Sequence, residues 1–117
     1  MNEEDRLDRS FSVLADSTRR AILSTLAQGP ATVQEVAEPF PMSAPAVSRH
    51  LKVLERAGLV TRTTRAQWRT LSLQPEPLDE VSAWLEQQRR DWNLRLDALE
   101  QHLETMKEKD HDDDHSP

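Results

Sequence analysis

Apolar residues recur at intervals of three and four along most of this chain, which is the pattern of amphipathic helices. The intervals predict helices in the segments 5–15, 17–28, 32–38, 44–57 and 78–109. The last helix is by far the longest, because about 30 residues rising 1.5 Å each span roughly 45 Å. A small domain cannot cover a helix of that length with its own core.

Capping residues mark the boundaries of the shorter helices. Asp16 and Ser43 stand just before two of them, where an N-cap side chain accepts a hydrogen bond from the first turn. Thr32 followed by Glu35 is the pattern of a capping box at the start of a third helix. Gly58 comes just past the end of the next helix, which is the usual position of a helix-ending glycine. These signals describe two helices joined by a short, proline-containing turn.

The pattern changes to that of strands after Gly58. Two runs rich in Thr and Val, 59–65 and 68–73, are separated by a short polar break and predict a β-hairpin. We therefore expect a single domain that is mostly α with a small β-hairpin (α+β).

The apolar residues of the last helix form a stripe with a near-heptad repeat. Its members are Leu78, Val81, Leu85, Trp92, Leu96, Leu99, Leu103 and Met106. A large apolar stripe is usually a packing surface. A dimer core is therefore favoured over a ligand pocket around Trp84 and Trp92.

Charge is distributed unevenly along the chain, whose net charge is −6. Residues 16–75 contain four acids and eight bases, whereas residues 76–117 contain thirteen acids and five bases. The acidic average therefore conceals a basic middle, which leaves a polyanionic partner open.

Several classes of protein are excluded or disfavoured by composition. The chain has no cysteine, which excludes disulfides, thiol catalysis and thiolate metal sites. No apolar run approaches the roughly 20 residues of a membrane span. The acidic start, "MNEEDRLDRS", does not resemble a signal peptide. We therefore expect a cytoplasmic protein. The carboxylates of the last helix have no His, Ser or Cys constellation beside them, so we expect no enzyme and no cofactor.

The segment 44–57 has one apolar and one basic face when it is drawn as a helix. Val47, Leu51 and Leu54 cluster on one side and face the core. The opposite side carries Pro45, Ser48, Arg49, Lys52 and Arg56, with His50 at the shoulder. An apolar back and hydrogen-bond donors near the N-terminal end suit a helix that enters the DNA major groove. A merely solvated face is the competing interpretation.

The predicted hairpin strengthens the DNA-binding interpretation. It contains Arg62, Arg65 and Arg69, with no acid between Thr61 and Leu73. A basic two-stranded wing beside a basic helix is typical of winged-helix DNA-binding proteins.

Two motifs then carry a specific resemblance. The segments "LADSTRRAIL" (residues 14–23) and "SAPAVSRHLKVLERAGLV" (residues 43–60) resemble the ArsR-type winged-helix transcriptional regulators, over residues 7 to about 105. The resemblance implies a homodimer and a recognition helix at Ser43–Ala57. It also implies a repressor that acts on its own or a neighbouring operon, and so on double-stranded DNA with a palindromic operator.

The resemblance and the residue patterns together give two sets of expected site residues. The expected DNA-binding residues are Ser43, Pro45, Ser48, Arg49, His50, Lys52, Arg56, Arg62, Arg65 and Arg69. The expected dimer interface, on the first and last helices, is Leu7, Phe11, Leu78, Val81, Leu85, Trp92, Leu96, Leu99 and Leu103.

The chain departs from the metal-sensing members of that family. The helix before the recognition helix contains no thiol, and the last helix offers His102 without a second helix-borne histidine. The chain is thus closer to the cysteine-free branch, and we expect no metal site.

Two alternatives remain open. His111 and His115 flank three aspartates and could hold Zn²⁺ or Ni²⁺ in a metal-responsive repressor. We favour a disordered acidic tail at 110–117, after a folded domain at 1–109. The acidic last helix also leaves open a protein-interaction module that keeps the fold without binding specific DNA.

Overall fold

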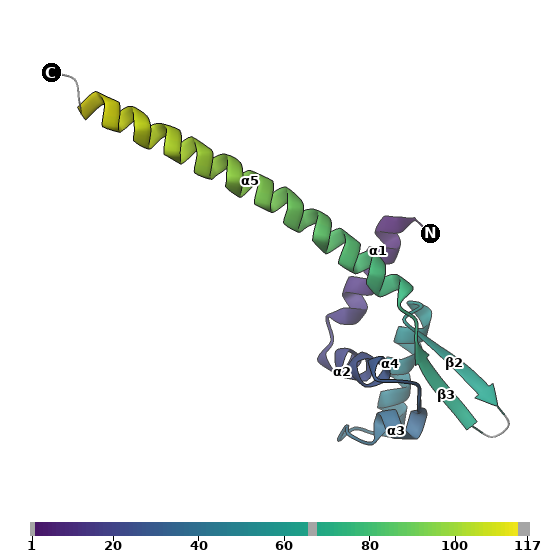
Figure 1. Cartoon of the computed structure of the whole chain (residues 1–117). Coiled ribbons are helices and arrows are strands. Elements are labelled where there is room, and N and C mark those ends of the chain that lie inside the picture. Colours follow the sequence, from purple (N-terminus) through teal and green to yellow (C-terminus); the bar gives the residue numbers. More distant parts are fainter. Residues whose placement is uncertain (1, 66–67, 115–117) are drawn as a thin grey trace. The chain divides into compact units, whose positions relative to one another are not determined.

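The computed structural model describes residues 2–65 and 68–114, and of residues 65 and 110–114 it describes the backbone alone. The elements in chain order are α1 (Glu3–Leu14), α2 (Ser17–Ala27), β1 (Ala31–Thr32), α3 (Val33–Ala37), α4 (Ala44–Arg56), β2 (Val60–Arg65), β3 (Trp68–Leu73) and α5 (Glu76–Asp114) (Figure 1). They form two compact units, Met1–Ser82 and Ala83–Pro117.

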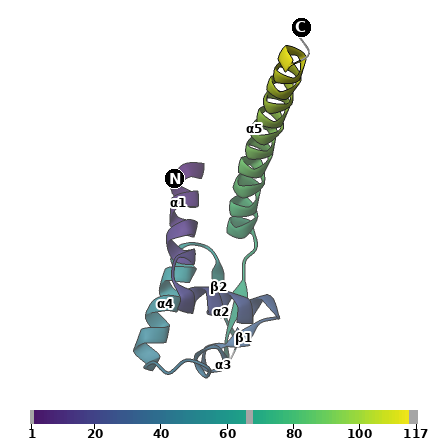
Figure 2. The ribbon, with the colours of Figure 1, turned by 90° about the vertical axis from the view of Figure 1, so that its left-hand side faces the viewer.

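The core of the first unit joins the three middle helices to the sheet. Its fully buried side chains are Ile22, Val36, Val47, Leu51, Leu54, Leu59, Val60 and Leu71. They come from α2, α3, α4, the residue before β2, and both long strands. Figure 2 shows α3 and α4 joined by a short turn, which is the predicted pair of helices. Burial of these side chains is the main source of the stability that fixes α4 in place.

The predicted caps are confirmed. The Asp16 carboxylate accepts a hydrogen bond from the backbone N–H of Arg19 at 3.0 Å. The side chains of Thr32 and Glu35 form the reciprocal bonds of a capping box. Gly58 has φ of 75°, a left-handed conformation that favours glycine.

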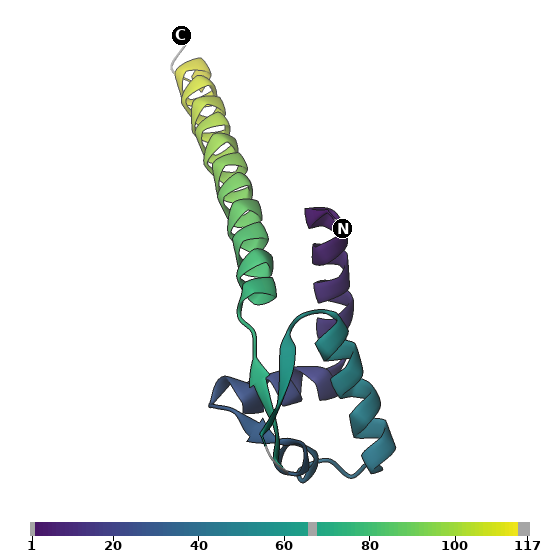
Figure 3. The same ribbon diagram turned by 90° about the vertical axis from the view of Figure 1, so that its right-hand side faces the viewer.

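The hairpin is confirmed, and the sheet has a third strand that the sequence pattern missed. β2 pairs with β3, and the two-residue β1 pairs with the other edge of β3, through Ala31 opposite Leu71. A strand of two residues is too short to show an alternation of apolar and polar positions. Figure 3 shows the hairpin beside α4, and β2 contacts that helix.

Helix α1 packs on the rest of its unit through a different face from the one that carries Leu7 and Phe11. Ser10 and Val13 are its buried residues, each 3% exposed. Leu7 is half-buried and Phe11 is 38% exposed. The face of α1 that carries Leu7 and Phe11 is thus only partly covered within the unit.

Helix α5 begins and ends beyond the predicted limits. It begins at Glu76, with Pro77 in its first turn, where the missing N–H costs nothing. It runs to Asp114, past the expected end at 109, because no Gly or Pro interrupts the sequence before Pro117. The side chains of 110–117 lie outside the described residues, so the separate acidic tail stays a prediction. Within the described part of the chain, no helix combines the length and hydrophobicity that crossing a membrane requires.

Candidate nucleic-acid interface

Helix α4 has the two faces that its sequence predicts. Val47, Leu51 and Leu54 are each at most 1% exposed and pack into the core. Pro45, Arg49 and Lys52 are exposed on the other side, and Ser48 is half-buried beside them. The interdigitated apolar side fixes the rotation of the helix, and therefore the direction in which its polar side faces.

The exposed face of α4 is positively charged. Among the side chains that the structure describes, none forms an ion pair with Arg49 or Lys52. The Nε atom of Arg49 donates to the carbonyl oxygen of Pro45, one turn earlier, at 3.4 Å. That bond leaves the terminal nitrogens of the guanidinium available to an external acceptor.

The N-terminal end of α4 is held by Ser43. Its Oγ accepts a hydrogen bond from the backbone N–H of Ala46 at 3.3 Å. A capping hydroxyl still has a proton to donate, so Ser43 can cap the helix and also contact an anion. The positive end of the helix dipole lies at the same place and favours a nearby phosphate.

His50 is half-buried and, unlike the other predicted DNA-binding residues of α4, is directed toward α2. Its Nδ1 atom lies 3.9 Å from Oδ1 of Asp16 and 3.4 Å from Nη1 of Arg19. The backbone N–H of Arg19, with the charges of Arg19 and His50, holds the pKa of Asp16 below its ordinary value of 3.8. The histidine therefore joins a polar cluster between α2 and α4.

Arg19 is a positioning residue that the sequence patterns did not identify. Its guanidinium donates to the carbonyl oxygens of Val13 at 2.8 Å and Ser12 at 3.2 Å. It also lies 3.9 Å from the carboxylate of Asp16. Arg19 thus ties the end of α1 to the start of α2, beside α4. The motif "LADSTRR" contains this residue, but its partners are carbonyl groups that a sequence pattern does not reveal.

The wing arginines differ in their surroundings. Arg62 donates through Nε and Nη2 to Oε1 of Glu55, at 3.1 Å and 2.7 Å. Arg69 is exposed, and among the described side chains it has no ion-pair partner. The side chain of Arg65 lies outside the described residues. Arg69 is therefore available to bind an external anion, whereas Arg62 is bound to Glu55 of α4.

Arg56, in the last turn of α4, is exposed at the opposite end of the helix from Ser43. Its carbonyl oxygen accepts a hydrogen bond from Nη1 of Arg9 in α1 at 3.1 Å. The structure thus brings Pro45, Ser48, Arg49 and Lys52 together, and it places Arg56 beside α1.

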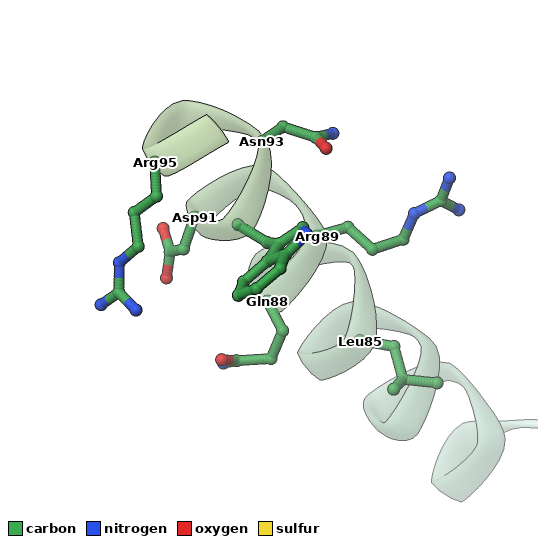
Figure 4. Close-up of a pocket in the computed structure, with 7 residues that line it drawn as sticks. Leu85, Gln88, Arg89, Asp91, Asn93 and Arg95 are labelled. Atoms are coloured by element: carbon green, nitrogen blue, oxygen red, sulfur yellow. The ribbon is translucent and has the colours of Figure 1, made fainter. Parts of the chain in front are cut away.

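A second candidate surface is the apolar stripe of α5. Leu85, Trp92, Leu96, Leu99 and Leu103 are all between 42% and 61% exposed. A hollow of about 430 Å³ lies on this helix beside Leu85 and Trp92. Figure 4 shows that its lining side chains all project from the one helix. Such a stripe needs a partner to remove it from water.

Two other predicted interface residues, Leu78 and Val81, lie in the first unit, where Leu78 is half-buried and Val81 is buried.

No candidate metal centre is found in the described part of the chain, where no three His, Asp or Glu side chains are arranged to hold an ion. His111 and His115 lie outside the residues whose side chains are described. A metal site in the C-terminal tail therefore stays an untested alternative to the expectation of no metal site.

Comparisons with known proteins agree with this geometry. A family model described as a helix-turn-helix domain matches residues 14–63. The chain is 41% identical over 98 residues to the HTH-type transcriptional regulator Rv2034 of Mycobacterium tuberculosis, covering 84% of this chain and 89% of that one. It is 32% identical over 79 residues to the transcriptional repressor SdpR of Bacillus subtilis, covering 68% of this chain and 88% of that one.

Solved structures of similar chains have the same fold. The crystal structure of an ArsR family transcriptional regulator is 40% identical, with a TM-score of 0.73, over 77% of this chain and 93% of that one. The homodimeric winged helix-turn-helix DNA-binding domain Mb0332 of Mycobacterium bovis is 29% identical, with a TM-score of 0.59, over 77% and 82%. This chain therefore belongs to the ArsR family of winged helix-turn-helix transcriptional regulators, which bind DNA and are not enzymes.

Proposed function

We propose that this protein is a cytoplasmic, homodimeric repressor that binds a palindromic operator upstream of its own or a neighbouring gene. The exposed face of α4 carries the proposal, because Arg49 and Lys52 project from a rigid helix with no described acid to neutralise them. The similarity to a regulator named as a repressor supports repression rather than activation.

The residues of α4 have different proposed roles. Ser48 and Arg49 lie in the N-terminal half of the helix and read base edges in the major groove, where a guanidinium can bind guanine through two hydrogen bonds. Lys52 and Arg56 bind phosphates, which fix the register of the protein on DNA. Ser43 and Pro45 approach the backbone of the DNA at the positive end of the helix dipole.

Dimerisation is assigned to α1 and α5. Leu7 and Phe11 lie on the face of α1 that its own unit covers only in part, and the stripe of α5 exposes five large apolar residues at intervals of three, four and seven. A second copy of the chain supplies an identical apolar surface, and symmetric pairing buries both. The similarity to a homodimeric winged-helix domain supports this assignment. Two recognition helices then enter successive major grooves, about 34–36 Å apart.

A gel-shift titration with the DNA upstream of the gene tests the proposed function. We expect a discrete complex with a dimer, and an affinity that falls steeply as salt rises, because each phosphate contact releases counterions. A folded dimer that shifts no DNA at low salt contradicts the proposal.

The acidic C-terminal part of the chain favours a second candidate, a protein-interaction module. Residues 76–117 carry thirteen acids and five bases, and the acids along α5 up to residue 109 are exposed except for half-buried Glu80. A partner captured through α5 would still bind after Ser48, Arg49 and Lys52 are replaced, whereas operator binding would be lost. The same triple variant therefore separates the two functions.

A further inference from the structure

The wing and the recognition helix are joined by a side-chain bridge that no sequence motif marks. Arg62, in β2, donates two hydrogen bonds to one carboxylate oxygen of Glu55, in the last turn of α4. Both side chains are partly buried, with 25% and 30% of their surface exposed. A charge-assisted contact of two bonds, partly shielded from water, is more restrictive than an exposed ion pair.

The position of Arg62 in the sheet explains why it reaches α4. Arg62 lies directly opposite Leu71, which is fully buried, so both side chains are on the face of the sheet that packs on the core. Val60, two residues earlier on the same face, is 2% exposed. The arginine therefore extends the inner surface of the wing toward the helix.

The bridge crosses a short connection. Only three residues, 57–59, separate α4 from β2, and Leu59 donates its backbone N–H to the carbonyl of Leu54 at 3.0 Å. The connection fixes where the hairpin begins. Arg62 lies two residues after the start of β2, so its bond to Glu55 fixes a second point of the hairpin. Two fixed points set the angle at which the hairpin leaves the helix.

We propose that Glu55 and Arg62 form a strut that holds the wing at a fixed angle to the recognition helix. Arg62 then supports operator binding as a positioning residue, whereas the exposed Arg69 contacts the phosphates. A phosphate that approached Arg62 would also approach the Glu55 carboxylate, whose charge repels it. The inference rests on the proposed binding of an operator through α4.

The salt dependence of operator binding distinguishes a strut from a phosphate contact. We would measure the dissociation constant at several salt concentrations from about 50 to 200 mM. The proteins compared are the wild type, Glu55→Gln, Arg62→Gln and the double variant. Arg69→Gln is the matched control on the same hairpin. Each phosphate contact makes the slope of log affinity against log salt more negative by about 0.9, so losing one per protomer makes the slope of a dimer less steep by about 2.

We expect Glu55→Gln and Arg62→Gln to weaken binding by similar factors, on the order of threefold to tenfold, with an unchanged salt slope. The double variant should bind no more weakly than either single variant, because the two side chains act as one unit. Arg69→Gln should make the slope less steep by about 2. Three results would contradict the proposed strut. Arg62→Gln could reduce the steepness of the slope as much as Arg69→Gln does, the losses could add in the double variant, or Glu55→Gln could bind more tightly.

Hydrogen exchange of the free protein gives a readout that needs no DNA. Glu55→Gln and Arg62→Gln should each speed the exchange of the β2 and β3 amides, whereas Arg69→Gln should not. If exchange is unchanged in Glu55→Gln and Arg62→Gln, the proposed strut is wrong, even if the wild type binds the operator. If the wild type binds no operator but these variants still speed exchange, the proposed function fails and the strut stands.

Discussion

The Nδ1 atom of His50 lies 3.9 Å from the Oδ1 atom of Asp16, so the carboxylate that caps α2 also faces the recognition helix. Arg19 completes the cluster, with its Nη1 atom 3.4 Å from the histidine ring. Helix α2 and helix α4 are therefore connected by polar contacts at the surface as well as by the apolar core. This cluster makes Asp16 important for stability although it lies outside the proposed DNA-binding face.

Replacement of Asp16 by alanine should destabilise the fold by about 1 kcal/mol, because the backbone N–H of Arg19 loses its capping acceptor. Asp16→Asn is the matched control, since asparagine caps a helix nearly as well. Chemical denaturation measures both free energies of unfolding. Equal losses in the two variants would show that the cap is not the source of the effect.

The stability contributed by the Asp16 carboxylate should depend on pH. Its pKa in the folded protein is lowered from 3.8, mainly by the hydrogen bond from the backbone N–H of Arg19. A lowered pKa means that the contribution is present above the unfolded-state pKa and is lost as the pH falls through the folded-state pKa. The wild type should therefore lose its advantage over Asp16→Asn below pH of about 4. A difference that stays constant from neutral pH to acid contradicts this.

Gly58 should tolerate asparagine better than alanine. Its φ of 75° strains a residue with a Cβ, although that atom would meet only Pro77 Cγ at an ordinary 3.8 Å. We expect Gly58→Ala to cost about 1 kcal/mol, and Gly58→Asn less, because asparagine adopts the left-handed conformation more readily. Thermal and chemical denaturation check the order, and an alanine variant as stable as the wild type contradicts the argument from strain.

Charge on the apolar stripe of α5 should break the dimer. Leu99 is 52% exposed within its own chain, so glutamate there leaves the fold of the protomer intact and instead places carboxylates in the proposed interface. We expect Leu99→Glu to weaken dimerisation on the order of 100-fold, measured by sedimentation. Leu94→Glu is the control, because Leu94 is also an exposed leucine, 67% exposed, but lies about 160° around the helix from the stripe. If both variants weaken dimerisation equally, the stripe is not the dimer interface.

Local signals predicted most of this fold. The caps at Asp16, Thr32 and Ser43, and the turn at Gly58, depend on neighbours within a few residues, and the structure contains all four. The strand β1 was missed because its two residues are defined only by pairing with β3, about 40 positions later. Pairing between distant segments leaves no periodic pattern in so short a strand.

The candidate site was predictable only in part, for the same reason. The 3.6-residue period of α4 separates its buried face from the face of Arg49 and Lys52, and the structure confirms that separation. The sequence pattern did not show that Glu55 engages Arg62. That contact depends on how the hairpin leaves the helix, which no residue type in the pattern specifies.

Selection of bound sequences from a random pool of double-stranded DNA tests the central claim most directly, with wild-type protein and Arg49→Ala side by side. We expect the wild type to enrich a palindrome whose half-sites are about 10–10.5 base pairs apart. Arg49→Ala should remain a folded dimer but lose preference at one position in each half-site, by a factor of roughly ten or more. A folded wild-type dimer that enriches no sequence, or an Arg49→Ala variant that enriches the same palindrome as strongly, would contradict the account.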